Sequence, residues 1–259
     1  MSGMPPRPRR GKAFWALPLG AALFFLGFLA LGVWQLQRLG WKQDLIARVE
    51  ARLAAAAAPP PARAAWPAVD KAGFEYRKLH LRGRFDPARE TLVAASTALG
   101  SGFWVLTPLR TEQGDWLLVN RGFVPPELRE RASRPADALE GDTELVGLLR
   151  LSEPGGSLLQ KNDPAAGRWY SRDVQAIATA RGLEGPVAPF FVDAAGDPRT
   201  EVWPRPGLTV LHFSNNHLGY ALTWFALAAM VAAALAYLLH DERRRRLAGD
   251  PALAHHDRD

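Results

Sequence analysis

The feature that most constrains this chain is a pair of long uncharged apolar runs, one near each end. Residues 13–33 (AFWALPLGAALFFLGFLALGV) and 218–239 (LGYALTWFALAAMVAAALAYLL) contain no charged side chain. A helix needs roughly 20 apolar residues to cross a bilayer. We therefore predict two transmembrane helices, over 13–36 and 214–240. The first run could instead be a cleaved signal peptide, but it is longer than the usual core of about 7–15 residues, which favours a retained anchor.

Basic residues close to the two runs predict the orientation of the chain. Arg7, Arg9, Arg10 and Lys12 precede the first run with no acidic residue among them, and four arginines, 243–246, follow the second. Basic residues next to a span stay on the cytoplasmic side. We expect a bacterial inner (plasma) membrane protein whose segments 1–12 and 241–259 are cytoplasmic. The residues between the spans then lie in the periplasm.

The segment after the first span shows a helical pattern that ends at prolines. An apolar side chain recurs every four residues, which is the spacing of one helix face, at Trp41, Leu45, Val49 and Leu53. We predict a juxtamembrane helical extension over 37–58, stopped by the three prolines at 59–61. The proline-rich stretch 59–67 is expected to be a stiff connector.

Residues 59–213 show the pattern of a β-rich domain. Short stretches rich in β-branched, aromatic and leucine residues are separated by turn residues, at 74–85, 91–95, 102–111, 115–124, 143–151, 189–194 and 207–213. Residues 112–115 suit a hairpin loop, and 171–181 suits one helix with Ser171 as its N-cap. The fold class expected is an α+β membrane protein, with two transmembrane helices flanking a periplasmic barrel-like or sandwich domain.

The composition excludes several classes of protein. The chain has no cysteine, so disulfides, thiolate metal sites and covalent haem attachment through cysteine are ruled out. The net charge of +6 comes from arginines that alternate with acidic residues, which argues against nucleic-acid binding. No enzyme signature such as G-x-S-x-G, H-E-x-x-H or a Walker loop is present, and no pair of histidines has metal-ligand spacing.

His217 is the candidate ligand, because it falls in the first turn of the second span. Tyr220 and Trp224 follow at i+3 and i+7, close to the same helix face. An interfacial belt of aromatic and polar side chains would give this pattern. So would an axial ligand to haem iron with aromatic side chains beside the macrocycle. In the second interpretation Gly20 and Gly27 form the wall of a slot between the two helices.

A second candidate is Arg121 in the stretch VNRGFVP (119–125), which closes a predicted strand. A guanidinium pairs well with carboxylates, so Arg121 could bind a haem propionate. The alternative is a structural ion pair inside the barrel. Gly122 indicates a bulge or a close approach of another backbone segment.

The chain resembles the surfeit-locus family of cytochrome c oxidase assembly factors. The resemblance runs through GVWQLQRLGWKQDLI (32–46), RGRFD (82–86), LVNRGFVP (118–125) and NNHLGYALTWFALA (215–228). It implies a non-enzymatic protein that binds haem a through His217, with Trp224 beside the macrocycle, and assists haem insertion into the oxidase large subunit. Where this family often has tyrosine, the chain has Phe225.

The partners that the resemblance implies are the oxidase large subunit and haem a synthase, next to the lipid bilayer. A homo-oligomer is left open. The alternative function is a haem-independent membrane scaffold, which would hold a nascent oxidase subunit through its periplasmic domain.

Overall fold

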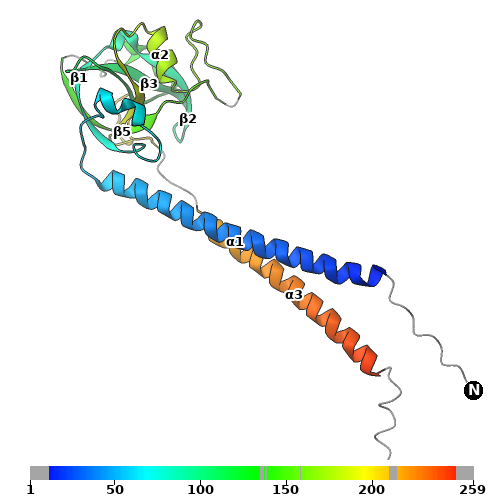
Figure 1. Cartoon of the computed structure of the whole chain (residues 1–259). Helices are drawn as coiled ribbons and strands as arrows, with labels where there is room; N and C mark the ends of the chain where they lie inside the picture. The colour runs from blue at the N-terminus through cyan, green and yellow to red at the C-terminus, as the bar shows by residue number, and fades with distance from the viewer. Residues whose placement is uncertain are drawn as a thin grey trace, which may run out of the picture. The chain divides into compact units, whose positions relative to one another are not determined.

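The computed structural model describes residues 12–134, 137, 139, 141–157, 159–209 and 215–248. The chain forms two compact units. One is formed by the described residues up to 47 and from 215 onward and is helical, and the other is a β domain within residues 48–212. The two long helices are α1 (Lys12–Ala54) and α3 (His217–Ala248), labelled in Figure 1.

Both long helices contain a stretch that can cross a membrane. Ala16–Ala54 and His217–Arg245 are long and apolar enough to do so, by length and composition. α1 has 43 residues, which corresponds to about 65 Å at 1.5 Å per residue, more than the roughly 30 Å of a bilayer core. Part of α1 therefore extends beyond any membrane that it crosses. The helix ends at Ala54 rather than at the predicted residue 58, because Ala58 forms a β-bridge with Leu79.

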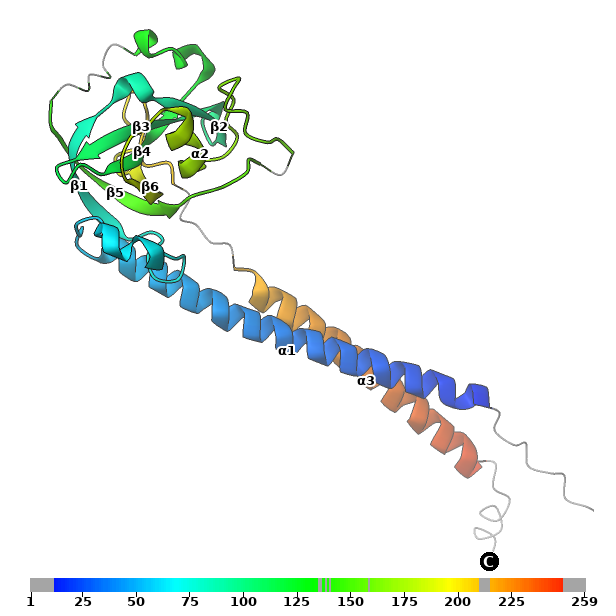
Figure 2. The same ribbon diagram turned by 45° about the horizontal axis from the view of Figure 1, so that its top comes forward.

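α1 and α3 run side by side over part of their length in both views (Figures 1 and 2). In each helix the more buried positions recur at alternating steps of three and four residues, which is the spacing of a helix–helix seam. They are 21, 25, 28, 32 and 35 in α1, and 217, 221, 224, 228 and 231 in α3.

The β domain contains a closed five-stranded barrel, in the order β1-β5-β6-β4-β3, which returns to β1. All neighbouring pairs are antiparallel except β4 and β6, which are parallel. β2 extends the sheet from the edge of β3. The strands are β1 (Lys78–Phe85), β2 (Thr91–Thr97), β3 (Gly100–Thr111), β4 (Trp116–Val124), β5 (Thr143–Leu151) and β6 (Val187–Ala194).

β3 closes the barrel because one edge of β3 pairs with two strands, β2 along its first part and β1 along its last part. Residues 100–106 pair with β2, and residues 109–111 pair with β1. Pro108 lies between the two pairings, at a position where a missing N–H breaks no ladder bond, and its carbonyl accepts from Asp86 N at 2.8 Å. A β-carbon on Gly83 would collide with the carbonyl of Arg110, so glycine permits the close approach of β1 to β3.

The β domain has two apolar clusters, one on each face of its central strands. One contains residues from all five barrel strands and fills the barrel interior, including Leu81, Leu109 and Phe190. The other lies between the sheet and the helix α2 (Val174–Ala180) (Figure 2), where Ile177 contacts Phe191 and its neighbours. β4 lies between the two clusters, so all nine of its residues are buried. This explains why its sequence is apolar almost throughout.

Several predicted boundaries were wrong. The first strand begins at Lys78, because residues 74–76 form a turn in which Tyr76 has a positive φ of 64°. The helix predicted over 171–181 spans only 174–180, and Asp173 is its N-cap, with its carboxylate accepting from Ala176 N. Residues 207–209 form no strand, and 210–213 lie outside the described residues. The hairpin loop at 112–115 is confirmed.

The stiff connector over 59–67 is partly helical. Residues Arg63–Ala68 form a 3₁₀ helix. Trp66 packs against the barrel-interior cluster and donates its indole N–H to the carbonyl of Pro61 at 3.0 Å. This segment therefore packs against the core of the β domain through Trp66.

Candidate functional site

In the first turn of α3, the His217 imidazole faces α1 and bonds to Gln35. Its Nδ1 lies 2.8 Å from Oε1 of Gln35. Gln35 is buried, with 9 % of its surface exposed, and His217 is half-buried. Within the described part of the chain, Nε2 of His217 takes part in no recorded hydrogen bond or ion pair. An imidazole that donates its Nδ1–H keeps a lone pair on Nε2, so Nε2 is the atom through which this ring can bind a metal.

The seam next to this pair is packed with aromatic rings. Phe28 of α1 stacks on Trp224 of α3, with ring centroids 5.7 Å apart and an interplanar angle of 26°. Phe225 presses against Gly32, where an added β-carbon would lie 2.5 Å from its ring. These contacts hold the two helices in one register, and that register places Gln35 opposite His217.

The structure separates the candidates on α3. Trp224 lies on the seam with His217, as the spacing predicted. Tyr220 lies off the seam and is 57 % exposed, so its phenol lies beside the helix pair rather than between the helices. Gly20 and Gly27 stay a prediction as a slot wall: a β-carbon on either would meet none of the described atoms within 4 Å, so neither marks a close approach of the two helices. The close approach between the helices is at Gly32 instead.

Arg121 is buried inside the β domain, with 8 % of its side chain exposed. Its guanidinium donates to both carboxylate oxygens of Asp137, at 2.6 and 2.5 Å, and to the hydroxyl of Thr107 at 3.0 Å. Arg134 and Glu90 complete this cluster. Burial lowers the pKa of Arg121, against the raising effect of Asp137 and Glu90. The alternative left open by the sequence, an ion pair inside the barrel, is therefore what the structure contains.

The rest of the VNRGFVP stretch is structural as well. Asn120 donates to Asp193 at 2.8 Å, and Asp193 also accepts from Arg150 at 3.0 Å. The close backbone approach expected at Gly122 is confirmed. Its φ is 134°, and a β-carbon there would collide with the carbonyl of Arg205. The glycine thus allows residue 205 to pair with β4 through Phe123.

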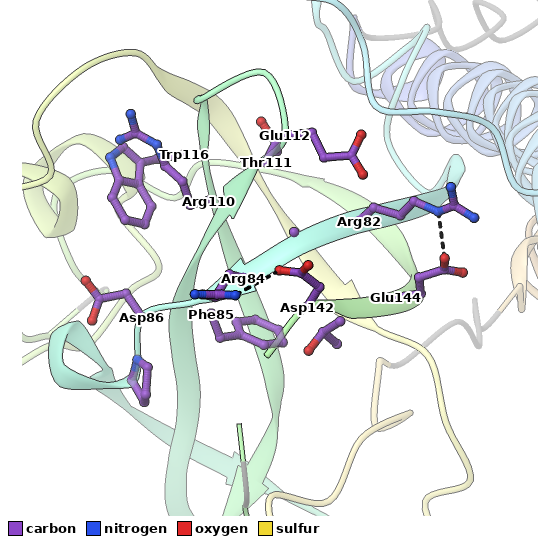
Figure 3. Close-up of a pocket in the computed structure, with 13 residues that line it drawn as sticks. Arg82, Arg84, Phe85, Asp86, Arg110, Thr111, Glu112, Trp116, Asp142 and Glu144 are labelled. Atoms are coloured by element: carbon purple, nitrogen blue, oxygen red, sulfur yellow. Dashed lines mark ion pairs between the residues drawn. The ribbon is translucent and has the colours of Figure 1, made fainter. Parts of the chain in front are cut away.

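The β domain carries a cleft of about 630 Å³ (Figure 3). Ion pairs cross its wall from β1, with Arg82 Nε 2.7 Å from Glu144 and Arg84 Nη2 3.4 Å from Asp142. A second cleft of about 870 Å³ shares Arg82, Thr111 and Glu112 with it. Because both signs of charge line these clefts, neither favours a simple anion or cation. They are better suited to a protein surface with mixed charges.

The donor set of the helical unit fits a haem that is held by one axial ligand. The described residues contain no group of three or more histidine, aspartate or glutamate side chains that could hold a metal ion alone. A single neutral imidazole is sufficient for haem iron, because the porphyrin supplies the other nitrogens. His217 offers that nitrogen next to Trp224 and Phe28, which provide flat apolar surfaces.

The chain thus has two helices long and apolar enough to span a membrane, a closed barrel between them in sequence, and one histidine paired across the helices. Residues 22–229 match the model of the SURF1 family. The chain is 35 % identical to Surfeit locus protein 1 of Homo sapiens over 218 residues, covering 77 % of this chain and 69 % of the human one.

Two further relatives agree. Surfeit locus protein 1 of Rattus norvegicus is 33 % identical over 235 residues, covering 85 % of this chain and 73 % of its own length. A SURF1-like protein of Monosiga brevicollis is 32 % identical, covering 89 % and 88 %. The chain therefore belongs to the SURF1 family.

Sequence reasoning missed Gln35, Phe28 and Gly32. Gln35 carried a usable signal, because it and Gln37 are the polar side chains of the otherwise apolar run 13–37. A buried glutamine in such a run needs a hydrogen-bond partner. The sequence could not show that this partner is His217, which lies 182 residues away along the chain.

Proposed function

We propose that this chain is an assembly factor for cytochrome c oxidase that binds haem a through His217 and assists its insertion into the oxidase large subunit. The observation that carries the proposal is the orientation of His217, whose Nδ1 is held by Gln35 while Nε2 is left without a recorded partner among the described residues. Membership of the SURF1 family supports the role in oxidase assembly.

The proposed role of each residue follows from its chemistry. His217 would hold the iron through Nε2, and Trp224 and Tyr220 would lie against the macrocycle, from the seam and from the exposed side of α3 respectively. Haem a would be held by His217, and it would supply an iron that a receiving protein can also bind. With one protein ligand, the cofactor stays exchangeable, as a carrier requires.

The proposed setting is a bacterial inner membrane, with both termini cytoplasmic and the β domain periplasmic. His217 begins the uncharged run of α3, and Gln35 lies near the end of the uncharged run of α1. The site would then be at the outer surface of the bilayer, where the helices of other membrane proteins can reach it from the side. Haem a synthase is the proposed donor, and the oxidase large subunit is the proposed acceptor.

The test is the visible spectrum of the full-length chain, purified from cells that make haem a. Wild-type protein should retain haem. The Soret absorption of His217→Ala should be at least tenfold lower, while the circular dichroism of its β domain should not change. His240→Ala is the matched control, because His240 is an exposed histidine on the same helix. Equal haem retention in wild type and His217→Ala would overturn the proposal.

A haem-independent scaffold is the second candidate, and the two adjoining clefts of the β domain favour it. In that case a nascent oxidase subunit would bind at the clefts. His217→Ala would leave the haem a content of the oxidase normal, while Arg82→Glu on the cleft wall would reduce oxidase assembly. The opposite pattern would reject the scaffold and support the haem carrier.

A further inference from the structure

Gln35 is a buried amide in an apolar helix, and its contact with His217 calls for a physical explanation. Its side chain lies on the seam of the helix pair, with 9 % of its surface exposed. A buried amide without a hydrogen bond is destabilising, and the recorded partner of this one is Nδ1 of His217, at 2.8 Å. Gln37, two residues further along the same helix, is exposed to its surroundings and has no such constraint.

We propose that Gln35 is the positioning residue for His217, an inference that rests on the proposed haem site. Its amide oxygen accepts the Nδ1–H of the imidazole, which fixes the tautomer and the direction of the ring. The lone pair is then on Nε2, the nitrogen assigned to the iron. Gln35 itself does not touch the cofactor.

Metal-ligating histidines generally donate their second ring N–H to an oxygen acceptor nearby. That acceptor sets the orientation and the basicity of the ligand, and its removal usually lowers metal affinity by about 10–100-fold. Gln35 Oε1 is in this position relative to His217. The stacking of Phe28 on Trp224 and the contact of Gly32 with Phe225 hold the helices so that the acceptor stays in place.

The structural alternative is that Gln35 and His217 only join the two helices. Interhelical hydrogen bonds in membranes have this use, and any donor–acceptor pair would serve. The two explanations differ in what they require. Helix joining is indifferent to the tautomer of His217 and to the strength of the acceptor, whereas ligand positioning depends on both.

The first measurement uses the full-length chain without haem, in lipid nanodiscs, with ¹⁵N-labelled histidine. Nitrogen chemical shifts distinguish a protonated from an unprotonated ring nitrogen. At a pH where the ring is neutral, we expect wild-type His217 to be a single tautomer with Nδ1 protonated. Gln35→Leu should give a mixture of tautomers, and the matched control Gln37→Leu should behave like wild type. A wild-type ring protonated on Nε2, or an unchanged tautomer in Gln35→Leu, would overturn the inference.

The second measurement is the affinity of the same proteins for ferric haem a. Gln35→Leu should bind about 10–100-fold more weakly than wild type, and Gln37→Leu should bind equally well. Gln35→Glu is the rescue variant, because a carboxylate is a stronger acceptor for Nδ1–H. It should bind at least as tightly as wild type and lower the reduction potential of the bound iron. Equal affinity and equal potential in all four proteins would reject positioning and leave helix joining.

Different results would contradict the proposed haem site and the proposed role of Gln35. If His217→Ala binds haem a as tightly as wild type, the proposed haem site is wrong, whatever Gln35 does. If His217→Ala abolishes binding and Gln35→Leu changes neither affinity nor tautomer, the haem site stands and the role of Gln35 is wrong. The affinity and potential of Gln35→Glu distinguish positioning from a weakened helix pair, because this variant keeps a polar pair at the seam and changes the strength of the acceptor.

Discussion

Each unit of this protein buries a polar group, but the two groups are arranged differently. In the β domain, Arg121 meets Asp137 through two hydrogen bonds and Thr107 through a third, and Arg134 pairs with Glu90 alongside. In the helical unit, His217 is held at Nδ1 alone. All three side-chain nitrogens of Arg121 are paired, with Thr107 and with both oxygens of Asp137, although the buried Glu90 Oε2 and Arg134 Nε beside them have no hydrogen-bond partner among the described residues. The imidazole of the helix pair keeps Nε2, which can bind something else.

This difference is the one expected between a structural polar group and the proposed ligand. A buried charge is tolerated only when it is paired and hydrogen-bonded, so a closed cluster is a sign of structural need. A half-buried imidazole that is hydrogen-bonded at one ring nitrogen is oriented and still has the other nitrogen available. This is the arrangement of a metal-ligating histidine. Both kinds of polar group occur in prominent sequence motifs, Arg121 in VNRGFVP and His217 in NNHLGYALTWF.

Arg121→Met should have the largest effect on stability. The change leaves the carboxylates of Asp137 and Glu90 buried with Arg134 as their remaining cation, and breaking a buried pair in this way costs about 3–5 kcal/mol. Denaturant unfolding of the full-length chain, followed by circular dichroism of the β domain, measures this loss. A loss below about 1 kcal/mol would mean that the cluster is not the closed structural unit described above.

Gly32→Ala should weaken the helix pair, because the new methyl group would overlap the ring of Phe225. Overpacking of this kind costs about 1–3 kcal/mol. The chain has no cysteine, so fluorophores on cysteines introduced at Leu19 and Tyr237 can report helix separation by energy transfer on heating. Gly27→Ala is the control, since a β-carbon there meets none of the described atoms within 4 Å. Equal separation temperatures for the two variants would contradict the described seam.

His217→Ala should change stability far less than Arg121→Met, even though it is expected to abolish haem binding. It removes one interhelical hydrogen bond, which averages about 0.6 kcal/mol in membrane proteins. The energy-transfer assay should show a small shift, and the unfolding of the β domain should not change. If the loss matched that of Arg121→Met, His217 would be a structural group, and the contrast between the two units would disappear.

Arg84→Ala should have the smallest effect. Arg84 and Asp142 form an exposed ion pair on the wall of the cleft, at 3.4 Å, and such pairs contribute less than about 0.5 kcal/mol. The same denaturant unfolding experiment should place it close to wild type. A loss of more than about 2 kcal/mol would show that the cleft wall is a structural cluster like the one around Arg121.

Much of the β domain could be predicted because its strands carry local signals. Residues 143–151 were predicted to the residue, and 91–95, 102–111 and 115–124 lie within or next to the observed strands. The errors occur where contacts distant in sequence override local pattern. Residues 74–76 have alternating side chains but form a turn, and the proline-rich connector is tied to the core by Trp66.

The site was predictable in part. His217 and Trp224 could be placed on one helix face from their spacing of seven residues, and both lie on the seam. Gly20 and Gly27 share the same spacing in α1, but a β-carbon on either meets none of the described atoms within 4 Å. Spacing gives the relation of residues within a helix and not the direction of its partner. Arg121 could not be assigned either, since its carboxylate partner Asp137 lies in a loop with no regular pattern.

The sequence by itself determined two apolar helices, a β-rich domain between them, membership of the family, and a histidine at the start of the second helix. These follow from local composition, periodicity and motif order, which do not depend on how the chain closes up. Only the tertiary structure decided that the strands form a closed barrel, that Arg121 is occupied by Asp137, and that Gln35 holds His217. Those outcomes depend on contacts between residues far apart in the chain, and no local pattern encodes the distance between them.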